Sequence, residues 1–208
     1  MDRSTRNAIE RATQRSRKLL EEDFCAQLEG TYDVLRTGSI APLAGDHLTP
    51  REGFQRELKT VLEQIRGQDR HASIMPIFLA LVIRNEEQGK PLIRLLSVLE
   101  RINFRVYMAR NVTKRNDTGQ GDLYAYAAAY FHKELLQEIP ENERKFHGFQ
   151  LEDDHQALEY LMVKFALWHA PDSVLEASLQ LEKDSTDDFF HWGGLRYFLM
   201  NYEQDLQP

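Results

Sequence analysis

The stretch that most constrains the fold is the run MPIFLALVI at residues 75–83, which would be apolar on every side of a helix. A helix at a protein surface interrupts such a run with polar residues on its outer face. The run is also shorter than the roughly 18 apolar residues that a membrane-spanning helix needs. The sequence therefore predicts a central buried helix that other helices surround.

Two further helices are well marked in the sequence. The segment 90–110 places its large aliphatic side chains on one face, namely Leu92, Leu95, Leu96, Leu99, Ile102 and Val106. Thr49 and Glu52 form a capping box around Pro50, so a helix is expected to begin there and to end at Gly67.

Helical periodicity continues through most of the chain. The remaining predicted helices lie at residues 3–36, 122–139 and 152–169, after Pro171, and at 195–206. Little of the chain alternates as a strand does. We expect an all-α fold, an irregular bundle of about eight helices, in a single domain over 1–208 with residues 1–36 as a helical arm.

Composition narrows the class of protein. The net charge of −7 means that the chain as a whole should not attract nucleic acid without local basic patches. Cys25 is the single cysteine, so an intramolecular disulfide framework or a zinc cluster of thiolates is excluded. The polar start of the chain does not read as a secretion signal. We expect a cytoplasmic protein that is not inserted in a membrane.

The histidines suggest packing and capping rather than metal binding. Glu152 to His155 spell EDDH, but consecutive residues of a helix diverge and cannot converge on one ion. Acids here are better suited to the positive end of a helix dipole. His132 and His169 each follow an aromatic residue and should pack beside it. We expect neither a metal site nor a cofactor.

One pair of residues suggests catalysis. Arg66 and His71 are separated by four residues, and this spacing resembles the Arg-x(4–6)-His motif of the HEPN ribonucleases, which are also helical. That resemblance implies that the pair activates a ribose hydroxyl and steadies the phosphate. A plain turn between two helices is the alternative, because Gly67 lies inside the motif.

Basic residues gather in two stretches that could follow phosphates. The first contains Arg3, Arg6, Arg11, Arg15, Arg17 and Lys18, and the second contains Arg101, Arg105, Arg110, Lys114 and Arg115. The candidates for DNA contact are Arg11, Arg15, Lys18, Arg101, Arg110, Lys114 and Arg115. A solvated face, or ion pairs with the acidic stretch 134–159, would account equally for these charges.

Two segments resemble one known family. Residues 77–110, which include the blocks IFLALVI and LERINFRV, are similar to the helical region of GmrSD-type restriction proteins. The segment WGGLRYFLMNYEQDL, which begins at Trp192, resembles a later helix of that family. Its matching positions are Leu195, Arg196, Tyr197, Leu199, Tyr202 and Glu203. We regard Arg105, Trp192, Arg196, Tyr202 and Glu203 as a structural signature of the resemblance.

The resemblance implies a role without implying chemistry. The family carries an Asp-Gly-Gln-Gln-Arg motif in a ParB-like nucleotide-handling domain and a His-Ile-x-Pro segment in an HNH nuclease domain. Neither motif occurs in this sequence. We therefore expect a fragment of a larger protein from a phage-defence system. It would be a non-catalytic helical domain that couples the nucleotide-handling domain to the HNH nuclease domain and contacts DNA. A small ribonuclease using Arg66 and His71, and an antitoxin-like or oligomerising interaction module, are the alternatives.

The C-terminal segment yields two structural expectations. Leu195, Phe198, Leu199 and Tyr202 follow helical spacing and should form a core face. Glu203 should pair with an arginine, and we expect that arginine to be Arg105, because it lies in a largely apolar helix where a charge needs a partner.

Overall fold

The computed structural model describes residues 31, 33–36, 52–68, 70–84, 90–109, 117–146, 149–180 and 194–206. Its helices are α3 (Glu52–Arg66), α4 (Met75–Ile83), α5 (Lys90–Ile102), the π-helix η2 (Asn103–Met108), α6 (Gln120–Phe131), α7 (Leu135–Glu138), the 3₁₀-helix η3 (Glu141–Glu143), α8 (Asp154–His169), α9 (Asp172–Leu179) and α10 (Leu195–Leu206). Strands β1 (Lys145–Phe146) and β2 (Phe149–Gln150) form one short antiparallel hairpin. The all-α fold is confirmed.

Several expectations fall outside the described residues. Within the predicted arm 1–36, the structure describes only residues 31 and 33–36, which are helical. Thr49 and Pro50 of the predicted capping box also lie outside it. The predicted end of that helix is confirmed, because α3 ends at Arg66 and Gly67 follows in a turn.

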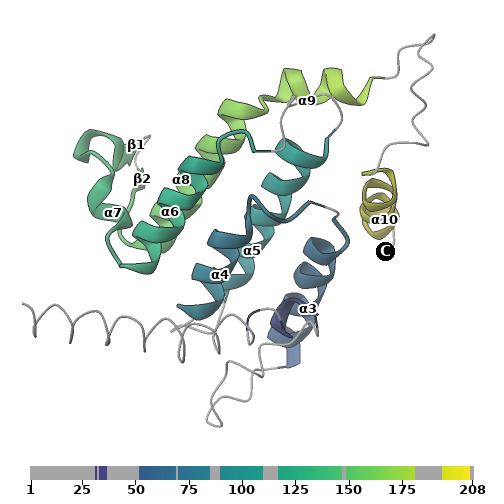
Figure 1. The fold of residues 1–208 in the computed structure, drawn as a ribbon, viewed down its shortest axis with the longest axis horizontal. Helices are drawn as coiled ribbons and strands as arrows, with labels where there is room; N and C mark the ends of the chain where they lie inside the picture. The colour runs from purple at the N-terminus through teal and green to yellow at the C-terminus, as the bar shows by residue number, and fades with distance from the viewer. Residues whose placement is uncertain are drawn as a thin grey trace, which may run out of the picture.

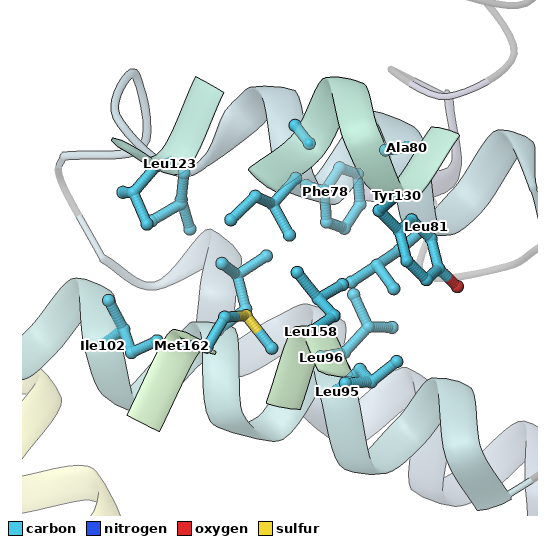
Figure 2. Packing of buried hydrophobic residues seen from close by; sticks show 14 of the residues in the cluster. Phe78, Ala80, Leu81, Leu95, Leu96, Ile102, Leu123, Tyr130, Leu158 and Met162 are labelled. Atoms are coloured by element: carbon cyan, nitrogen blue, oxygen red, sulfur yellow. The ribbon is translucent and has the colours of Figure 1, made fainter. Parts of the chain in front are cut away.

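Helix α4 is the buried central helix that its sequence predicts. Its side chains from Ile77 to Val82 are at most 5% exposed, except Leu79, which is half-buried. Pro76 lies in its first turn, where a missing backbone N–H costs no hydrogen bond. In Figure 2, α4 side chains such as Phe78 and Leu81 meet residues of α5, α6 and α8 in a single cluster.

Helix α5 joins the two sides of the bundle. It packs on α3, α4 and α8, and Figure 1 shows α4 and α5 between α3 on one side and α6 and α8 on the other. The six aliphatic residues predicted to share a face are all buried, from Leu92 at 4% exposed to Val106 at 0%. The periodicity therefore predicted this interface correctly.

The single helix predicted over 122–139 is wrong, because the chain breaks between α6 and α7. Lys133 adopts a left-handed conformation with φ of 62°. The N–H of Glu134 donates to the Ala129 carbonyl at 2.9 Å, and that of Lys133 donates to the Tyr130 carbonyl at 3.1 Å. These are the bonds of a Schellman C-cap, which a lysine rarely closes and which composition therefore did not indicate.

A buried ion pair explains why the chain turns here. Arg84 follows α4 and donates both to the Tyr130 carbonyl and to Asp154 Oδ2, the latter at 3.0 Å. Asp154 Oδ1 accepts from the Leu136 N–H at 2.9 Å. The two charged side chains are only 12% and 10% exposed. One ion pair therefore ties together the ends of α4, α6, α7 and α8.

The acids before α8 act as expected. Asp153 is the N-cap of α8, and its carboxylate accepts from the Gln156 N–H at 2.8 Å. Asp154, the next residue, forms the ion pair with Arg84. Among the described residues, no group of three His, Cys, Asp or Glu side chains is arranged to hold a metal ion.

Helix α10 faces the bundle differently from the prediction. Leu199 is 46% exposed and Tyr202 is 55% exposed, so they do not form a core face. Instead, the Tyr197 ring packs on Phe104 of η2 with ring centroids 4.9 Å apart. Asn201 Oδ1 accepts from Gln64 Nε2 of α3 at 2.9 Å. These two contacts help to orient α10, and apolar periodicity could not indicate them.

The expected Arg105–Glu203 ion pair is wrong. Arg105 donates to the Asp172 carboxylate and to the Ala170 carbonyl, both at 2.5 Å. Glu203 is exposed on α10. The chain turn between α8 and α9 brings Asp172 to η2, and this turn supplies the partner that the buried part of Arg105 needs.

Gly119 is held in a tight turn before α6. Its φ is 65°, and a Cβ there would lie 2.4 Å from Phe165 and 2.6 Å from His169 Nε2. The His169 ring packs on Phe165 with centroids 4.4 Å apart. The predicted packing of His169 beside Trp168 is wrong, because Trp168 is 81% exposed and His169 packs on Phe165, four positions earlier in α8.

We predict that Gly119→Ala and Gly121→Ala change stability in opposite directions. Gly119→Ala should lower the free energy of unfolding by about 2 kcal/mol or more, because it combines left-handed strain with a steric clash. Gly121 has open space around its Cβ position within α6, so alanine there should stabilise by roughly 0.5–1 kcal/mol. Urea denaturation measures both changes. Equal effects of the two variants would contradict the tight turn.

Candidate functional site

The two predicted catalytic residues are engaged with separate backbone carbonyls. Arg66 is exposed at the end of α3, and its Nη1 donates to the Arg36 carbonyl at 3.0 Å. His71 is half-buried, and its Nε2 lies 2.6 Å from the Ile65 carbonyl, so this nitrogen carries the proton. Arg66 thus ties the end of α3 to the segment 33–36, whereas His71 closes the connection that follows α3. The catalytic hypothesis stays a prediction.

The predicted DNA-contact residues lie mostly outside the described residues. This group comprises Arg11, Arg15, Lys18, Arg110, Lys114 and Arg115. Arg101 is exposed near the end of α5, whereas Arg105 of η2 is paired with Asp172. The described part of the second basic stretch therefore offers one exposed arginine rather than a continuous patch.

The signature residues of α10 face solvent. Arg196, Tyr202 and Glu203 are exposed, and Trp192 lies outside the described residues. Tyr197, which is half-buried against Phe104, is the matching position that helps to hold α10 on the bundle.

Polar side chains gather at one place in the interior. The described part of the chain buries five polar residues, namely Thr31, Gln68, Ser73, Glu100 and Asn103. Gln68 and Ser73 come from the connection between α3 and α4, Glu100 from α5, and Asn103 from η2. We define the polar junction as these last four residues together with Tyr107. It joins α3, α4, α5 and η2.

Gln68 is the centre of the polar junction. Its Nε2 donates to the backbone carbonyl of Glu100 at 3.1 Å and to Glu100 Oε1 at 2.6 Å. Its Oε1 accepts from Asn103 Nδ2 at 2.5 Å. Gln68, Glu100 and Asn103 are each at most 4% exposed. One buried amide therefore satisfies groups on both α5 and η2.

Tyr107 forms the second half of the polar junction. Its hydroxyl donates to the Thr118 carbonyl at 2.8 Å, in the turn before α6. Burial raises the pKa of Tyr107 to about 12, although a hydrogen bond with Ser73 opposes that rise. Ser73 Oγ also accepts from Gln120 Nε2 at 3.1 Å. The junction thus extends from α3 to the start of α6.

The polar junction coincides with a departure from α-helical geometry. The backbone is a π-helix from Asn103 to Met108, and it closes with the Ala109 N–H donating to the Phe104 carbonyl at 2.7 Å. π-Helical turns are uncommon, and they are frequent at functional sites. Arg70 Nη1 donates to the Tyr107 carbonyl at 3.0 Å and so supports a carbonyl of this segment.

Glu100 has a strongly perturbed acidity. Burial raises its pKa from the ordinary 4.5 to about 7, while Arg101 and the hydrogen bond from Gln68 act in the opposite direction. A carboxyl with such a pKa can gain or lose a proton near neutral pH. The polar junction can therefore bind a proton.

The periodicity of α5 and η2 contains a signal for Glu100 and Asn103. Glu100 follows Leu96 by four positions, and Asn103 follows Leu99 by four, so both polar residues lie on the apolar side of one helix. Polar residues on a buried face need internal partners. Gln68 could not be identified in this way, because it lies in an irregular connection with no periodicity.

A second feature is apolar and solvent-exposed. Val163 is 42% exposed, Leu167 is 50% exposed, and Trp168 is the most exposed large apolar side chain among the described residues. We call these three residues the α8 apolar surface. The neighbouring Lys164 donates to Glu143 Oε2 at 2.6 Å, which lowers the pKa of Glu143 and raises that of Lys164. The nearby charge is thus held aside from the apolar side chains.

Comparisons of the chain with protein-family models, curated proteins and solved structures find no match. Within the described residues, no helix is both long and apolar enough to cross a membrane.

We predict that Gln68→Ala destabilises the protein by about 3 kcal/mol, because it leaves buried groups of Glu100 and Asn103 without a partner. Gln55→Ala is the matched control, since Gln55 is exposed on α3 and should change stability by no more than about 0.5 kcal/mol. Chemical denaturation at pH 7 compares the two variants. Similar losses would show that the hydrogen bonds of Gln68 do not stabilise the fold.

Proposed function

We propose that this chain is a non-catalytic helical scaffold domain that docks a protein partner on its α8 apolar surface. The observation that carries the proposal is the exposure of Trp168, which is 81% exposed beside the half-exposed Leu167. Large exposed apolar side chains in a group are typical of protein interaction sites. Tryptophan is also enriched among residues that contribute most to binding.

The scaffold role is supported by how the other candidate groups are used. Arg66 contacts the Arg36 carbonyl, His71 contacts the Ile65 carbonyl, and Arg105 pairs with Asp172. Arg84 and Asp154 pair in the interior. These contacts favour structural roles for the groups that a nuclease would need free at its surface.

The family resemblance gives the proposal its setting. A domain similar to the helical region of GmrSD-type proteins would connect a nucleotide-handling domain to an HNH nuclease in a phage-defence protein. The partner on the α8 apolar surface would then be one of those nuclease domains. The DNA contacts that the basic stretches suggest would be a secondary part of this role.

We predict that Leu167→Lys abolishes phage restriction in cells that carry the intact system, with little change in the Tm of the purified chain. Lysine would place a charge in the docking surface, whereas an exposed position on a helix tolerates it. Leu199→Lys is the matched control, because Leu199 is a leucine of similar exposure on α10. It should retain restriction. Loss of restriction in both variants, or in neither, would reject docking at α8.

The ribonuclease alternative makes a separate prediction. If the chain is a scaffold, the purified protein with intact Arg66 and His71 should leave single-stranded RNA uncleaved in the presence of EDTA. Cleavage that is lost in His71→Ala but kept in His132→Ala would reject the scaffold proposal, since His132 is an exposed histidine on another turn. Circular dichroism would verify that both variants are folded.

A further inference from the structure

The orientation of the amides in the polar junction is fixed by chemistry. A backbone carbonyl can only accept a hydrogen bond, so the atom of Gln68 that contacts the Glu100 carbonyl must be its nitrogen. The oxygen of Gln68 then faces Asn103, which must present its own nitrogen. The Asn103 oxygen therefore points elsewhere, and its assignment follows from the contacts of Gln68.

Asn103 Oδ1 lacks a hydrogen-bond donor among the described residues. Asn103 Oδ1 is fully buried and accepts no hydrogen bond from the part of the chain that the structure describes. A buried carbonyl oxygen without a donor costs about 1–3 kcal/mol. The side chain of Glu100 lies three positions earlier on the same side of the helix, which is a neighbouring position.

The two observed hydrogen bonds run in the same donor-to-acceptor direction around the set Asn103, Gln68 and Glu100. Asn103 donates to Gln68, and Gln68 donates to Glu100. A donor on Glu100 that reaches Asn103 Oδ1 would complete a head-to-tail ring of three hydrogen bonds. A carboxylate has no such donor, whereas a protonated carboxyl has one O–H and keeps its other oxygen as an acceptor for Gln68.

We propose that Glu100 is a buried proton-binding residue whose protonated carboxyl donates to Asn103 Oδ1 and closes the ring with Gln68. The carboxyl proton moves no further, and no other bond forms or breaks. Ionisation removes the closing bond and leaves a negative charge beside the Asn103 oxygen in a buried site, which is unfavourable. The raised pKa of Glu100 agrees with the neutral form below about pH 7.

Other charges near the junction have known partners or face solvent. On α5, Arg101 is exposed and is the described charge that favours ionised Glu100. On η2, Arg105 pairs with Asp172 of α9. The α3–α4 connection contributes Arg70 and His71, which contact the Tyr107 and Ile65 carbonyls.

The elements packed on α5 contribute further titratable groups. The α3 groups whose exposure the structure describes are Arg56, Glu57, Lys59, Glu63 and Arg66, and all of them are exposed. At the end of α4, Arg84 pairs with Asp154, and on α8 Glu159 pairs with Arg94. We therefore assign the neutral-range proton of the polar junction to Glu100.

Closing the ring has a consequence for α10. Gln68, which follows α3, hydrogen-bonds to Glu100 of α5 and to Asn103 of η2. Helix α10 contacts α3 through Gln64 and η2 through Phe104. If the ring opens, Gln68 keeps its bonds to Glu100 and Asn103. The bond between Glu100 and Asn103 is lost, however, and the Glu100 charge repels Asn103 Oδ1 at the start of η2, next to Phe104. Proton release at Glu100 is thus expected to loosen α10. This role is independent of docking at the α8 apolar surface.

Glu100→Gln tests the proposal, because a glutamine amide can donate to Asn103 and accept from Gln68 without titrating. The folded pKa of Glu100 lies above its ordinary value, so its stabilising effect is complete below about pH 4.5 and is lost as pH rises to about 7. The ratio of the folding equilibrium constants, E100Q over wild type, should increase about tenfold per pH unit in this window and level off above it. Glu57→Gln, on the exposed side of α3, should show no such trend.

Two measurements decide the outcome. Carbon-13 NMR of the Glu100 carboxyl should titrate with a midpoint near neutral pH, and a midpoint near 4.5 would overturn the proposal. Hydrogen exchange in α10 should become faster in wild type relative to E100Q between pH 5 and pH 8. Equal exchange in the two proteins throughout this range would reject the link between Glu100 and α10. A stable fold in which E100Q follows the wild-type pH dependence would reject the proton site itself.

Discussion

The burial of α5 is the constraint on which the rest of the structure depends. This helix is packed by α3, α4 and α8 and continues directly into η2, so little of its circumference is free for solvent. A polar residue on its inner side must find its partners within the protein. Glu100 and Asn103 meet that demand through Gln68, which belongs to a connection rather than to a helix. The apolar packing of α5 thus determines where buried polar side chains must find hydrogen-bond partners.

The parts of the fold that follow from local patterns could be predicted from the sequence. The uniform apolar character of MPIFLALVI indicated burial of α4, and regular spacing indicated the inner face of α5. The acids at the start of α8 were predicted to suit a helix N-terminus, and Asp153 is the N-cap, because capping is a contact within one turn. In each case the signal lies within a single helix and does not depend on which distant element the helix contacts.

The parts that depend on distant contacts could not be predicted in the same way. The end of α6 uses a left-handed lysine, and its neighbouring carbonyl is bound by Arg84 from another helix. The orientation of α10 depends on Gln64, which lies 137 residues before its partner Asn201. The predicted partner of Arg105, Glu203, was wrong, because the turn after α8 brings Asp172 to η2 instead. Polar long-range contacts have no periodicity that a sequence could display.

The π-helix η2 also shifts the helical register of its own later residues. A π-helical segment holds one residue more than the α-helical turns that it replaces, so it rotates later side chains by about 100° around the axis. Tyr107 lies within this segment and donates from the polar junction to the Thr118 carbonyl. Removing one residue from η2 would restore an ordinary helix and would turn this side chain away. The π-helical segment thus rotates the side chains along the continuous α5–η2 helix, so that they can point toward two different faces.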